Sequence, residues 1–273
     1  MKKFLSFILC LGMGFSLGTN ADAFEGADAV HAGAAAIAAA AAESLEAPEN
    51  VAENIPVLMY HDVGDVESGL YISEEHFRQH LEYFRDKGYT PVTMSQICAH
   101  WTEGAPLPEK PVVLTFDDGY RSMYETVFPM LQEFGYTATF FVIPAARWSD
   151  WAVDEAMIKE MSDAGMEIGS HTYNHLQLTL LEEEDMLFEL TESKKIIEQL
   201  TGREVVSLCY PVGYHNEAVV SAAGECGYKI AVTTRYGLSS LEQGILSLDR
   251  IRIVRGDSAR LLEYKLSGKL GVP

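Results

Sequence analysis

The sequence predicts an α/β protein in which helices cover a parallel β-sheet. Short apolar, β-branched runs alternate with amphipathic helical patterns from Ile55 to the C-terminal region. The runs have the length and composition of strands buried on both faces, and the helical patterns have recognisable caps at their ends. Alternation of this kind indicates one α/β domain. The pattern alone is compatible with an open doubly wound sheet and with a closed barrel.

Six apolar runs are the predicted strands. They are residues 55–60 (IPVLMY), 111–116 (PVVLTF), 138–143 (ATFFVI), 166–170 (MEIGS), 205–210 (VVSLCY) and 229–234 (KIAVTT). Parallel strands in such folds direct their carboxyl ends to one face, where active sites gather. We therefore expect the polar residues that directly follow four of these runs to converge: His61 with Asp62, Asp117 with Asp118, His171, and Pro211–Gly213.

The helical patterns have predictable ends. Ser73 is the expected N-cap of a helix that carries Phe77, Leu81 and Phe84 on one face and ends at Gly88. Thr179 and Glu182 predict a capping box before a helix that ends at Gly202. Three further helices are expected to end at Gly135, Gly165 and Gly227.

The N-terminal region predicts an exported protein. Residues 1–23 combine Lys2 and Lys3, an apolar segment from Phe4 to Leu17, and the cleavage pattern Ala21-Asp22-Ala23 typical of a secretory signal peptide. An uncleaved anchor is the alternative, although the apolar segment is shorter than the roughly 20 residues of a spanning helix. Residues 24–54 form an alanine-rich, acidic linker that lacks the large apolar residues needed for packing. Residues 55–273 then form a single domain, expected to be monomeric, periplasmic or secreted, and without stable membrane insertion after cleavage.

Charge and cysteine content restrict the partners and the chemistry. The 40 acidic and 20 basic residues give a formal net charge of −20, which argues against nucleic acid as a partner. Cys98, Cys209 and Cys226 remain after signal cleavage, without the C-x-x-C spacing of a metal site. A Cys209–Cys226 disulfide and buried free thiols are both compatible with this pattern.

Two motifs carry the candidate chemistry. In SHTYNH, His171 and His175 are four residues apart, and a helical turn would direct both imidazoles to one side. A carboxylate from a neighbouring strand end would complete a site for zinc, with cobalt, nickel or iron as alternatives. In TFDDGY, the adjacent Asp117 and Asp118 can supply such a ligand and also a general base for a hydrolase. Taken alone, the same Asp-Gly sequence is also typical of a simple turn.

Together, TFDDGY and SHTYNH resemble the motifs of the polysaccharide deacetylase family, carbohydrate esterase family four with its nodulation-type deacetylase homology domain. The resemblance covers residues 55–267, and IPVLMYHDV with the Y-P-x-G loop resembles the biofilm exopolysaccharide N-deacetylases of that family. It implies a distorted (β/α) barrel with about seven parallel strands. It also implies that Asp118, His171 and His175 bind a divalent metal ion and that Asp117 is the general base. The loop Tyr210-Pro211-Val212-Gly213 would contact substrate, with a backbone N–H near Val212 at the oxyanion.

The function implied by the resemblance is removal of N-acetyl groups from N-acetylglucosamine units of an extracellular or cell-wall polysaccharide, with release of acetate. An O-acetyl esterase acting on a xylan-like glycan is one alternative. A sugar-binding homologue with little catalytic activity is the other. The polysaccharide is the expected partner in each case.

The chain departs from the family pattern at two motifs. The arginine of the R-x-P-Y motif, which orients the catalytic aspartate, is replaced by Cys209. Arg250 and Arg252 are candidate replacements, with Arg250 preferred, and surface ion pairs are the alternative role for both. The L-x-H motif that supplies the general acid is absent, and His61 is the preferred substitute, as acid or as pocket-lining residue, over His215.

Other residues have weaker functional assignments. Trp148 and Trp151 follow a predicted strand and are expected either to line a sugar groove or to pack against the domain. His76, His80 and His100 lie on helical patterns without neighbouring carboxylates and are not assigned to the site.

Overall fold

The computed structural model describes residues 54–64 and 70–267. The predicted signal peptide and residues 24–53 of the predicted linker lie outside the described residues. Within the described ranges, no helix is both long and apolar enough to cross a membrane.

Seven parallel strands close into a barrel in the order β1-β10-β9-β8-β7-β6-β5, and β5 pairs back onto β1. The closure confirms the predicted distorted (β/α) barrel and excludes an open sheet. Val113 of β5 pairs with both β1 and β4, and Thr115 pairs with both β1 and β6. β4 and β6 therefore share one edge of β5, which is the distortion of the barrel. The barrel strands and β4 are β1 (Val57–Tyr60), β4 (Thr90–Val92), β5 (Pro111–Phe116), β6 (Thr139–Val142), β7 (Glu167–Ser170), β8 (Ser207–Cys209), β9 (Ile230–Tyr236) and β10 (Leu248–Arg252).

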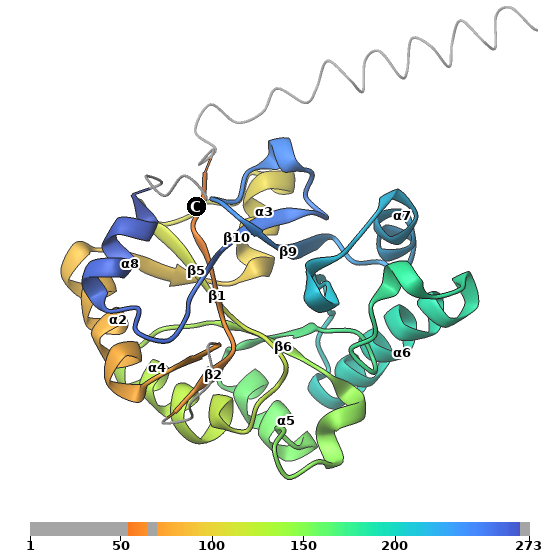
Figure 1. Ribbon diagram of the computed structural model, residues 1–273, viewed down its shortest axis with the longest axis horizontal. Coiled ribbons are helices and arrows are strands. Elements are labelled where there is room, and N and C mark those ends of the chain that lie inside the picture. Colours follow the sequence, from red (N-terminus) through yellow and green to blue (C-terminus); the bar gives the residue numbers. More distant parts are fainter. Residues whose placement is uncertain (1–53, 65–69, 268–273) are drawn as a thin grey trace, which may run out of the picture. The chain divides into compact units, whose positions relative to one another are not determined.

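All six predicted strands are present, but β4 and β10 were not among them. A short parallel pair, β2 (Asp62–Val63) and β3 (Tyr71–Ile72), follows β1. The helices lie around the barrel strands (Figure 1). They are α2 (Glu74–Lys87), α3 (Met94–Glu103), α4 (Phe128–Phe134), α5 (Glu155–Asp163), α6 (Glu183–Thr201), α7 (Glu217–Glu225) and α8 (Ala259–Leu266).

The predicted helix ends are correct at α2 and wrong at the start of α6. The Ser73 hydroxyl accepts the N–H of His76, and Gly88 ends α2 with φ 72°. Glu182, and not Thr179, precedes the first residue of α6, and no side chain caps it. Thr179 instead lies in a 3-10 turn, Leu178–Leu180, where its hydroxyl accepts a hydrogen bond from Gln177. The turn removes Thr179 from the helix, whereas Glu182 stays directly before its first residue.

Alternate strand residues face two hydrophobic clusters. Leu58, Leu114, Phe116 and Phe140 pack outward against the helices. Val57, Val113, Phe141 and Val232 belong to a second cluster inside the barrel, together with apolar residues of α3. Because side chains alternate along a strand, β1, β5, β6, β8, β9 and β10 contribute to both cores.

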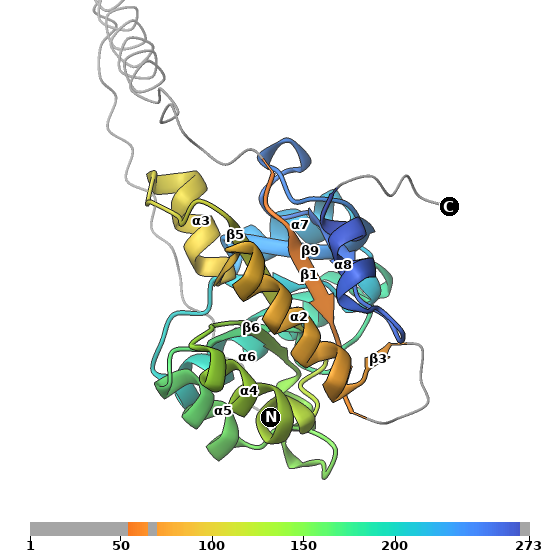
Figure 2. The same ribbon diagram turned by 90° about the vertical axis from the view of Figure 1, so that its left-hand side faces the viewer.

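Helix α3 closes the amino-terminal end of the barrel. The Thr139 hydroxyl accepts the N–H of Met94, and the Glu167 carboxylate accepts the N–H of Ser95 at 2.9 Å. Figure 2 shows α3 at the end where β1 begins, with β3 at the opposite end. A negative side chain at a helix N-terminus is favourable, so Glu167 fixes α3 over the opening.

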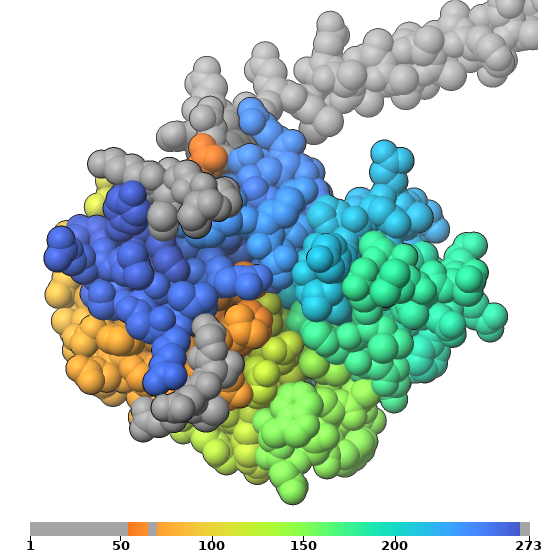
Figure 3. Space-filling view, viewed as in Figure 1, coloured from red at the N-terminus to blue at the C-terminus, as the bar shows by residue number. Residues whose placement is uncertain are grey.

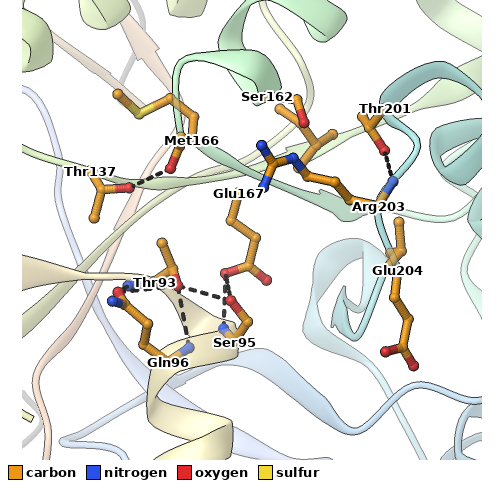
Figure 4. Close-up of a pocket in the computed structure, with 13 residues that line it drawn as sticks. Thr93, Ser95, Gln96, Thr137, Ser162, Met166, Glu167, Thr201, Arg203 and Glu204 are labelled. Atoms are coloured by element: carbon orange, nitrogen blue, oxygen red, sulfur yellow. Dashed lines mark hydrogen bonds between the residues drawn. The ribbon is translucent and has the colours of Figure 1, made fainter.

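A pocket of about 410 Å³ lies at this same amino-terminal end. It is lined by residues at the beginnings of strands and of α3, including Thr93, Ser95 and Glu167, and the carboxylate of Glu167 points toward Ser95 (Figure 4). The carboxyl ends of the strands lie at the other end of the barrel. This pocket is therefore separate from the convergence of motif residues predicted above.

A buried polar network joins α2 and α8 to the barrel. Nε2 of His80 donates to the backbone carbonyl of Asp257 at 2.7 Å, and Nδ1 accepts from the Tyr60 hydroxyl at 2.9 Å. The Asp257 carboxylate pairs with Lys265 of α8. On the surface, α2 and α8 lie side by side and are linked by the Lys87–Glu263 ion pair (Figure 3).

Candidate active site

The carboxyl ends of β5 and β7 bring three potential metal ligands together. Oδ1 of Asp118 lies 3.4 Å from Nε2 of His171 and 3.5 Å from Nε2 of His175. The three donor atoms lie within 4.8 Å of one another. His171 is buried, whereas His175 and Asp118 are partly exposed. The cluster is therefore open to solvent on one side, as a catalytic metal site requires.

The two histidines converge through a loop and not through the helical turn expected from their spacing. Residues 171–175 contain no helix, and both Thr172 (φ 61°) and His175 (φ 62°) adopt the left-handed conformation. The N–H of His175 donates to the Thr172 hydroxyl at 3.1 Å. The imidazole centroids lie 4.6 Å apart. This local conformation replaces the helical geometry that the spacing had suggested.

The tautomer of His171 suits metal binding. Its Nδ1 lies 2.7 Å from the backbone carbonyl of Cys209, and because a carbonyl only accepts, Nδ1 carries the proton. In the neutral ring, which is the form that binds a metal ion, Nε2 is then the unprotonated nitrogen, and it faces Asp118. A backbone acceptor on the far nitrogen is a common way to orient a metal-binding imidazole.

Asp117 and Asp118 point to different partners although they are adjacent. Asp118 is left-handed (φ 77°) and is followed by left-handed Gly119 (φ 73°), so the chain turns sharply after Asp117. Asp118 faces the histidines, whereas Asp117 is 2% exposed and faces Arg250. The Asp-Gly turn therefore separates the two carboxylates.

Arg250 and Asp117 form a buried, bidentate ion pair. Nη1 and Nη2 of Arg250 lie 2.8 and 2.7 Å from the two carboxylate oxygens of Asp117. The guanidinium also donates to the Thr115 hydroxyl at 2.9 Å and to the Thr233 carbonyl at 2.8 Å. Burial alone would raise the pKa of Asp117, but the Arg250 guanidinium lowers it well below its ordinary value. Asp117 is thus held as a carboxylate.

Of the two candidate arginines, the structure places Arg250 against Asp117 and leaves Arg252 outside the cluster. Arg250 is fully buried in β10, and Arg252 is partly exposed. The Cys209 thiol, at the position of the missing motif arginine, lies 3.5 Å from Asp117 and 3.3 Å from Nη2 of Arg250. Sequence reasoning did not assign Thr115, Thr233 or Cys209 to this network. The only feature of the sequence that pointed to this network was Cys209 itself, because it stands where the family motif has an arginine.

His61 lies at the end of β1 beside these groups. Its Nδ1 is buried and has no hydrogen-bond partner among the described residues. Burial lowers the pKa of His61, against the opposing effect of the Asp117 and Asp118 carboxylates. His215 instead stacks on Tyr210 with centroids 5.3 Å apart.

The Tyr210–Gly213 loop follows β8 and presents a single exposed side chain. Val212 is 51% exposed and left-handed (φ 53°), whereas Tyr210, Pro211 and Gly213 are buried. The Tyr210 hydroxyl donates to the Leu246 carbonyl at 2.9 Å. The Tyr210 side chain therefore supports the loop from below, and only the residues around Val212 face solvent.

Aromatic residues lie on the segments that follow β5 and β6. The ring of Tyr120 packs 5.6 Å from Trp151, and burial and the Asp118 carboxylate raise the pKa of Tyr120. Trp148 is 72% exposed, and the guanidinium of Arg147 lies over its ring, 4.7 Å from the centroid. Neither Trp148 nor Trp151 is fully packed into the core, and Tyr120 is a neighbour of Asp118 that sequence reasoning did not single out.

The three cysteines in the described part of the chain are free thiols. Cys209 is buried beside Asp117, and Cys98 and Cys226 are likewise unpaired. The considered Cys209–Cys226 disulfide is therefore not formed. Cys209 faces the barrel interior, where it contacts the ion pair instead.

Comparison with known proteins identifies the family. The polysaccharide deacetylase profile matches residues 104–231. A Bacillus subtilis (strain 168) protein named as a polysaccharide deacetylase, YxkH, is 34% identical over 204 residues, which cover 75% of this chain and 73% of that protein. The poly-beta-1,6-N-acetyl-D-glucosamine N-deacetylase of Escherichia coli (strain K12) is 32% identical over 154 residues, 48% of this chain and 23% of that enzyme.

A solved structure shows the same relationship. The Streptococcus pyogenes deacetylase PplD, in complex with acetate, superposes with a TM-score of 0.75 at 28% identity, covering 80% of this chain and 99% of that one. The matching profile, the extent and identity of the YxkH match, and this shared fold agree with the motifs at the ends of β5 and β7. The chain belongs to the polysaccharide deacetylase family.

Proposed function

We propose that this protein removes N-acetyl groups from N-acetylglucosamine units of an extracellular or cell-wall polysaccharide and releases acetate. Membership of the family makes it a hydrolase that acts on amide bonds. The name of the Escherichia coli relative supports an N-acetylglucosamine polymer as substrate. The observation that carries the proposal is the Asp118–His171–His175 cluster beside an ionised, arginine-paired Asp117.

The cluster fits one divalent metal ion. Two imidazole nitrogens and one carboxylate oxygen, with an open side, are a donor set suited to zinc, and cobalt, nickel and iron are alternatives. When bound, such an ion would polarise a carbonyl oxygen and lower the pKa of a water. Asp118, His171 and His175 are the residues proposed to hold it.

The other residues of the site are assigned to proton transfer or to substrate binding. Asp117 accepts the proton of the water that attacks the acetyl carbon, and Arg250 keeps the carboxylate ionised and oriented. The backbone N–H near Val212 donates to the developing oxyanion, in the loop whose exposed position supports contact with substrate. His61 lines the pocket beside Asp117 or protonates the departing amine. Trp148 is proposed to contact a sugar ring.

Replacement of the base tests this assignment. We expect Asp117→Asn to lower acetate release about 10²- to 10⁴-fold, the usual contribution of general base catalysis. Zinc affinity should stay near that of the wild-type protein, because Asp117 is not one of the three ligands. The measurements are acetate release from an N-acetylglucosamine oligomer and zinc titration. Full activity of Asp117→Asn would show that another group is the base.

A substrate panel tests the function. The purified protein, loaded with zinc or cobalt, would be incubated with poly-N-acetylglucosamine, peptidoglycan, chitin oligomers and acetylated xylan, and acetate would be measured. Release from the N-acetylated polymers is expected. Release from acetylated xylan alone would identify an O-acetyl esterase, and glycan binding without release would identify a sugar-binding homologue.

Such substrates imply an exported protein. We infer that the mature protein acts as a monomer in the periplasm or after secretion, with residues 1–23 as its signal peptide. N-terminal sequencing of the protein recovered from a cell fractionation would test both the cleavage site and the compartment. A mature protein that begins at Met1 and stays in the cytosol would contradict it.

A further inference from the structure

The loop that carries both metal-binding histidines is held by a buried carboxylate of α6. Glu189 is 1% exposed and lies on the helix face that also buries Met186, Leu190 and Ile197. Its Oε2 accepts the backbone N–H of Asn174 at 2.7 Å, and its Oε1 accepts the Asn174 side-chain amide at 2.7 Å. The backbone carbonyl of Glu189 accepts the N–H of Tyr173 at 3.1 Å. All these bonds go to the segment between His171 and His175.

Packing alone does not account for a glutamate at this position. Burying a carboxylate without a cationic partner costs free energy unless hydrogen bonds replace the lost water. No lysine, arginine or histidine forms an ion pair with Glu189 in the part of the chain that the structure describes. Both carboxylate oxygens accept hydrogen bonds from Asn174 instead. The hydrogen bonds to Asn174 are therefore the reason for its charge.

The loop needs such an anchor because its conformation is intrinsically unfavourable. Thr172 and His175 are both left-handed, which L-residues other than glycine rarely adopt. The Glu189–Asn174 bonds lie between these two residues. Without them the loop would be free to return to an extended conformation, and Nε2 of His175 would move away from Asp118 and His171.

We propose that Glu189 is a positioning residue for the metal site, which acts through Asn174 to hold His175 in its ligand geometry. The inference rests on the proposed function, since it takes the Asp118–His171–His175 cluster to bind a divalent ion. Glu189 itself touches neither the ligands' donor atoms nor the reacting groups. Its effect is expected on metal affinity before it is seen in catalysis.

Glu189→Gln is the first test. Glutamine keeps the size of the side chain, but one terminal oxygen becomes an amide donor that cannot accept from Asn174. We expect the zinc affinity of the full-length protein, measured by competition with a chromogenic chelator, to fall about 10- to 100-fold. Loss of a residue that orients a metal ligand through hydrogen bonds typically has an effect of this size. The visible spectrum of the cobalt-loaded protein should change as well, because it reports the ligand geometry.

Glu198→Gln is the matched control. Glu198 also lies on α6, and its Oε1 accepts the backbone N–H of Val205 at 3.0 Å, in a loop that carries no metal ligand. Glu198 is more exposed than Glu189 and also pairs with Lys194 at 3.0 Å, so the stability of each metal-free variant to urea is measured separately. Only Glu189→Gln should weaken zinc binding and alter the cobalt spectrum.

The outcomes separate this inference from the proposed function. Should Glu189→Gln fail to fold, Asn174→Ala removes the Oε1 bond from the exposed side. It is expected to weaken zinc binding about 10-fold, the lower end of the range for such groups. Wild-type zinc affinity in the folded Glu189 variant, or in Asn174→Ala, overturns the inference, as does an equal loss in Glu198→Gln. A wild-type protein that binds neither zinc nor cobalt overturns the proposed function as well.

Discussion

Arg250 crosses the barrel interior and joins three strands at Asp117. Its guanidinium donates to Asp117 and Thr115 of the β5 segment, to the Thr233 carbonyl of β9 and to the Cys209 thiol of β8. The side chain is fully buried. A buried ion pair adds little net stability over an apolar pair, but removal of one partner leaves an uncompensated charge. The functional value of the pair lies in the ionised, oriented carboxylate that the proposed general base requires.

Arg250→Met should therefore destabilise the protein strongly. We expect a loss of about 3–5 kcal/mol in the free energy of unfolding, because the Asp117 carboxylate remains buried without its partner. The double variant Asp117→Asn/Arg250→Met should recover a substantial part of that loss. Urea unfolding followed by circular dichroism measures all three proteins. Equal instability of the single and double variants would mean that lost packing, and not the unpaired charge, is the cause.

Gly213 lies in the proposed oxyanion loop at a position that only glycine fits. Its φ is 78°, and an added Cβ would lie 2.1 Å from the hydroxyl oxygen and 2.5 Å from the backbone nitrogen of Thr234. Gly88 has a similar φ of 72° but open space around it. An alanine at Gly88 would therefore introduce backbone strain alone, whereas an alanine at Gly213 would add a steric clash with Thr234.

Gly88→Ala should cost only the left-handed strain, about 1–2 kcal/mol. Gly213→Ala should cost clearly more and should also lower acetate release, because the loop must shift around Val212. The measurements are urea unfolding and acetate release for both variants. Wild-type activity in Gly213→Ala would show that the position of this loop does not matter for catalysis.

At the scale of elements, His80 connects α2 with β1 and with the segment before α8. Burial lowers the pKa of His80 from 6.5 to about 4, against the raising effects of the Asp257 carbonyl and carboxylate. Tyr60, Lys265 and His76 are the other polar groups that face it. The folded state therefore favours neutral His80, and the unfolded chain takes up the proton first as the pH falls.

The stability that neutral His80 contributes is present above about pH 6.5 and is lost as the pH falls toward about 4. The loss in the free energy of unfolding is on the order of 3 kcal/mol, because each unit of the difference between the unfolded and folded pKa corresponds to about 1.4 kcal/mol. His80→Gln should flatten the dependence of unfolding free energy on pH in this window. Urea unfolding at pH 7.5, 6, 5 and 4.5 provides the test. An unchanged slope in His80→Gln would assign the acid sensitivity to other groups.

The strands and loops also show which structural features could be predicted from local sequence and which could not. The strands β1 and β5 to β9 were predictable, because each is a continuous apolar run whose burial needs no partner information. Strand β10 was missed because Asp249, Arg250 and Arg252 interrupt its apolar pattern. The Asp249 and Arg250 side chains pair with Arg235 and Asp117 on other segments of the chain. Arg250 lies 133 residues from Asp117, and it could be predicted as the partner only because the resemblance to the family showed that the motif arginine is missing. The family motifs named Asp118, His171 and His175, which the structure brings together, but the left-handed loop and its Glu189 anchor depend on tertiary contacts.

At the scale of the whole molecule, the two ends of the barrel differ: one is closed by a helix, and the other carries the candidate metal site. The amino-terminal opening is closed by α3 and the Glu167 hydrogen bonds. At the carboxyl end, Asp118 follows β5 while His171 and His175 follow β7, and β6 lies between these strands. A metal ion held by this cluster would join the ends of two strands that do not pair with each other. Metal binding should therefore stabilise the entire fold.

The size of that stabilisation follows from mass action. At a free zinc concentration 100 times the dissociation constant, binding to the folded state alone adds about 2.7 kcal/mol. For a domain of this size, each kcal/mol corresponds to about 2–4 °C, so the midpoint of thermal unfolding should rise by about 5–10 °C. Asp118→Asn should remove most of this rise, because it lacks the charged ligand, while Asp117→Asn should keep it. Differential scanning calorimetry of chelator-treated and zinc-loaded proteins measures the shift, and an equal rise in Asp118→Asn would place the zinc elsewhere on the molecule.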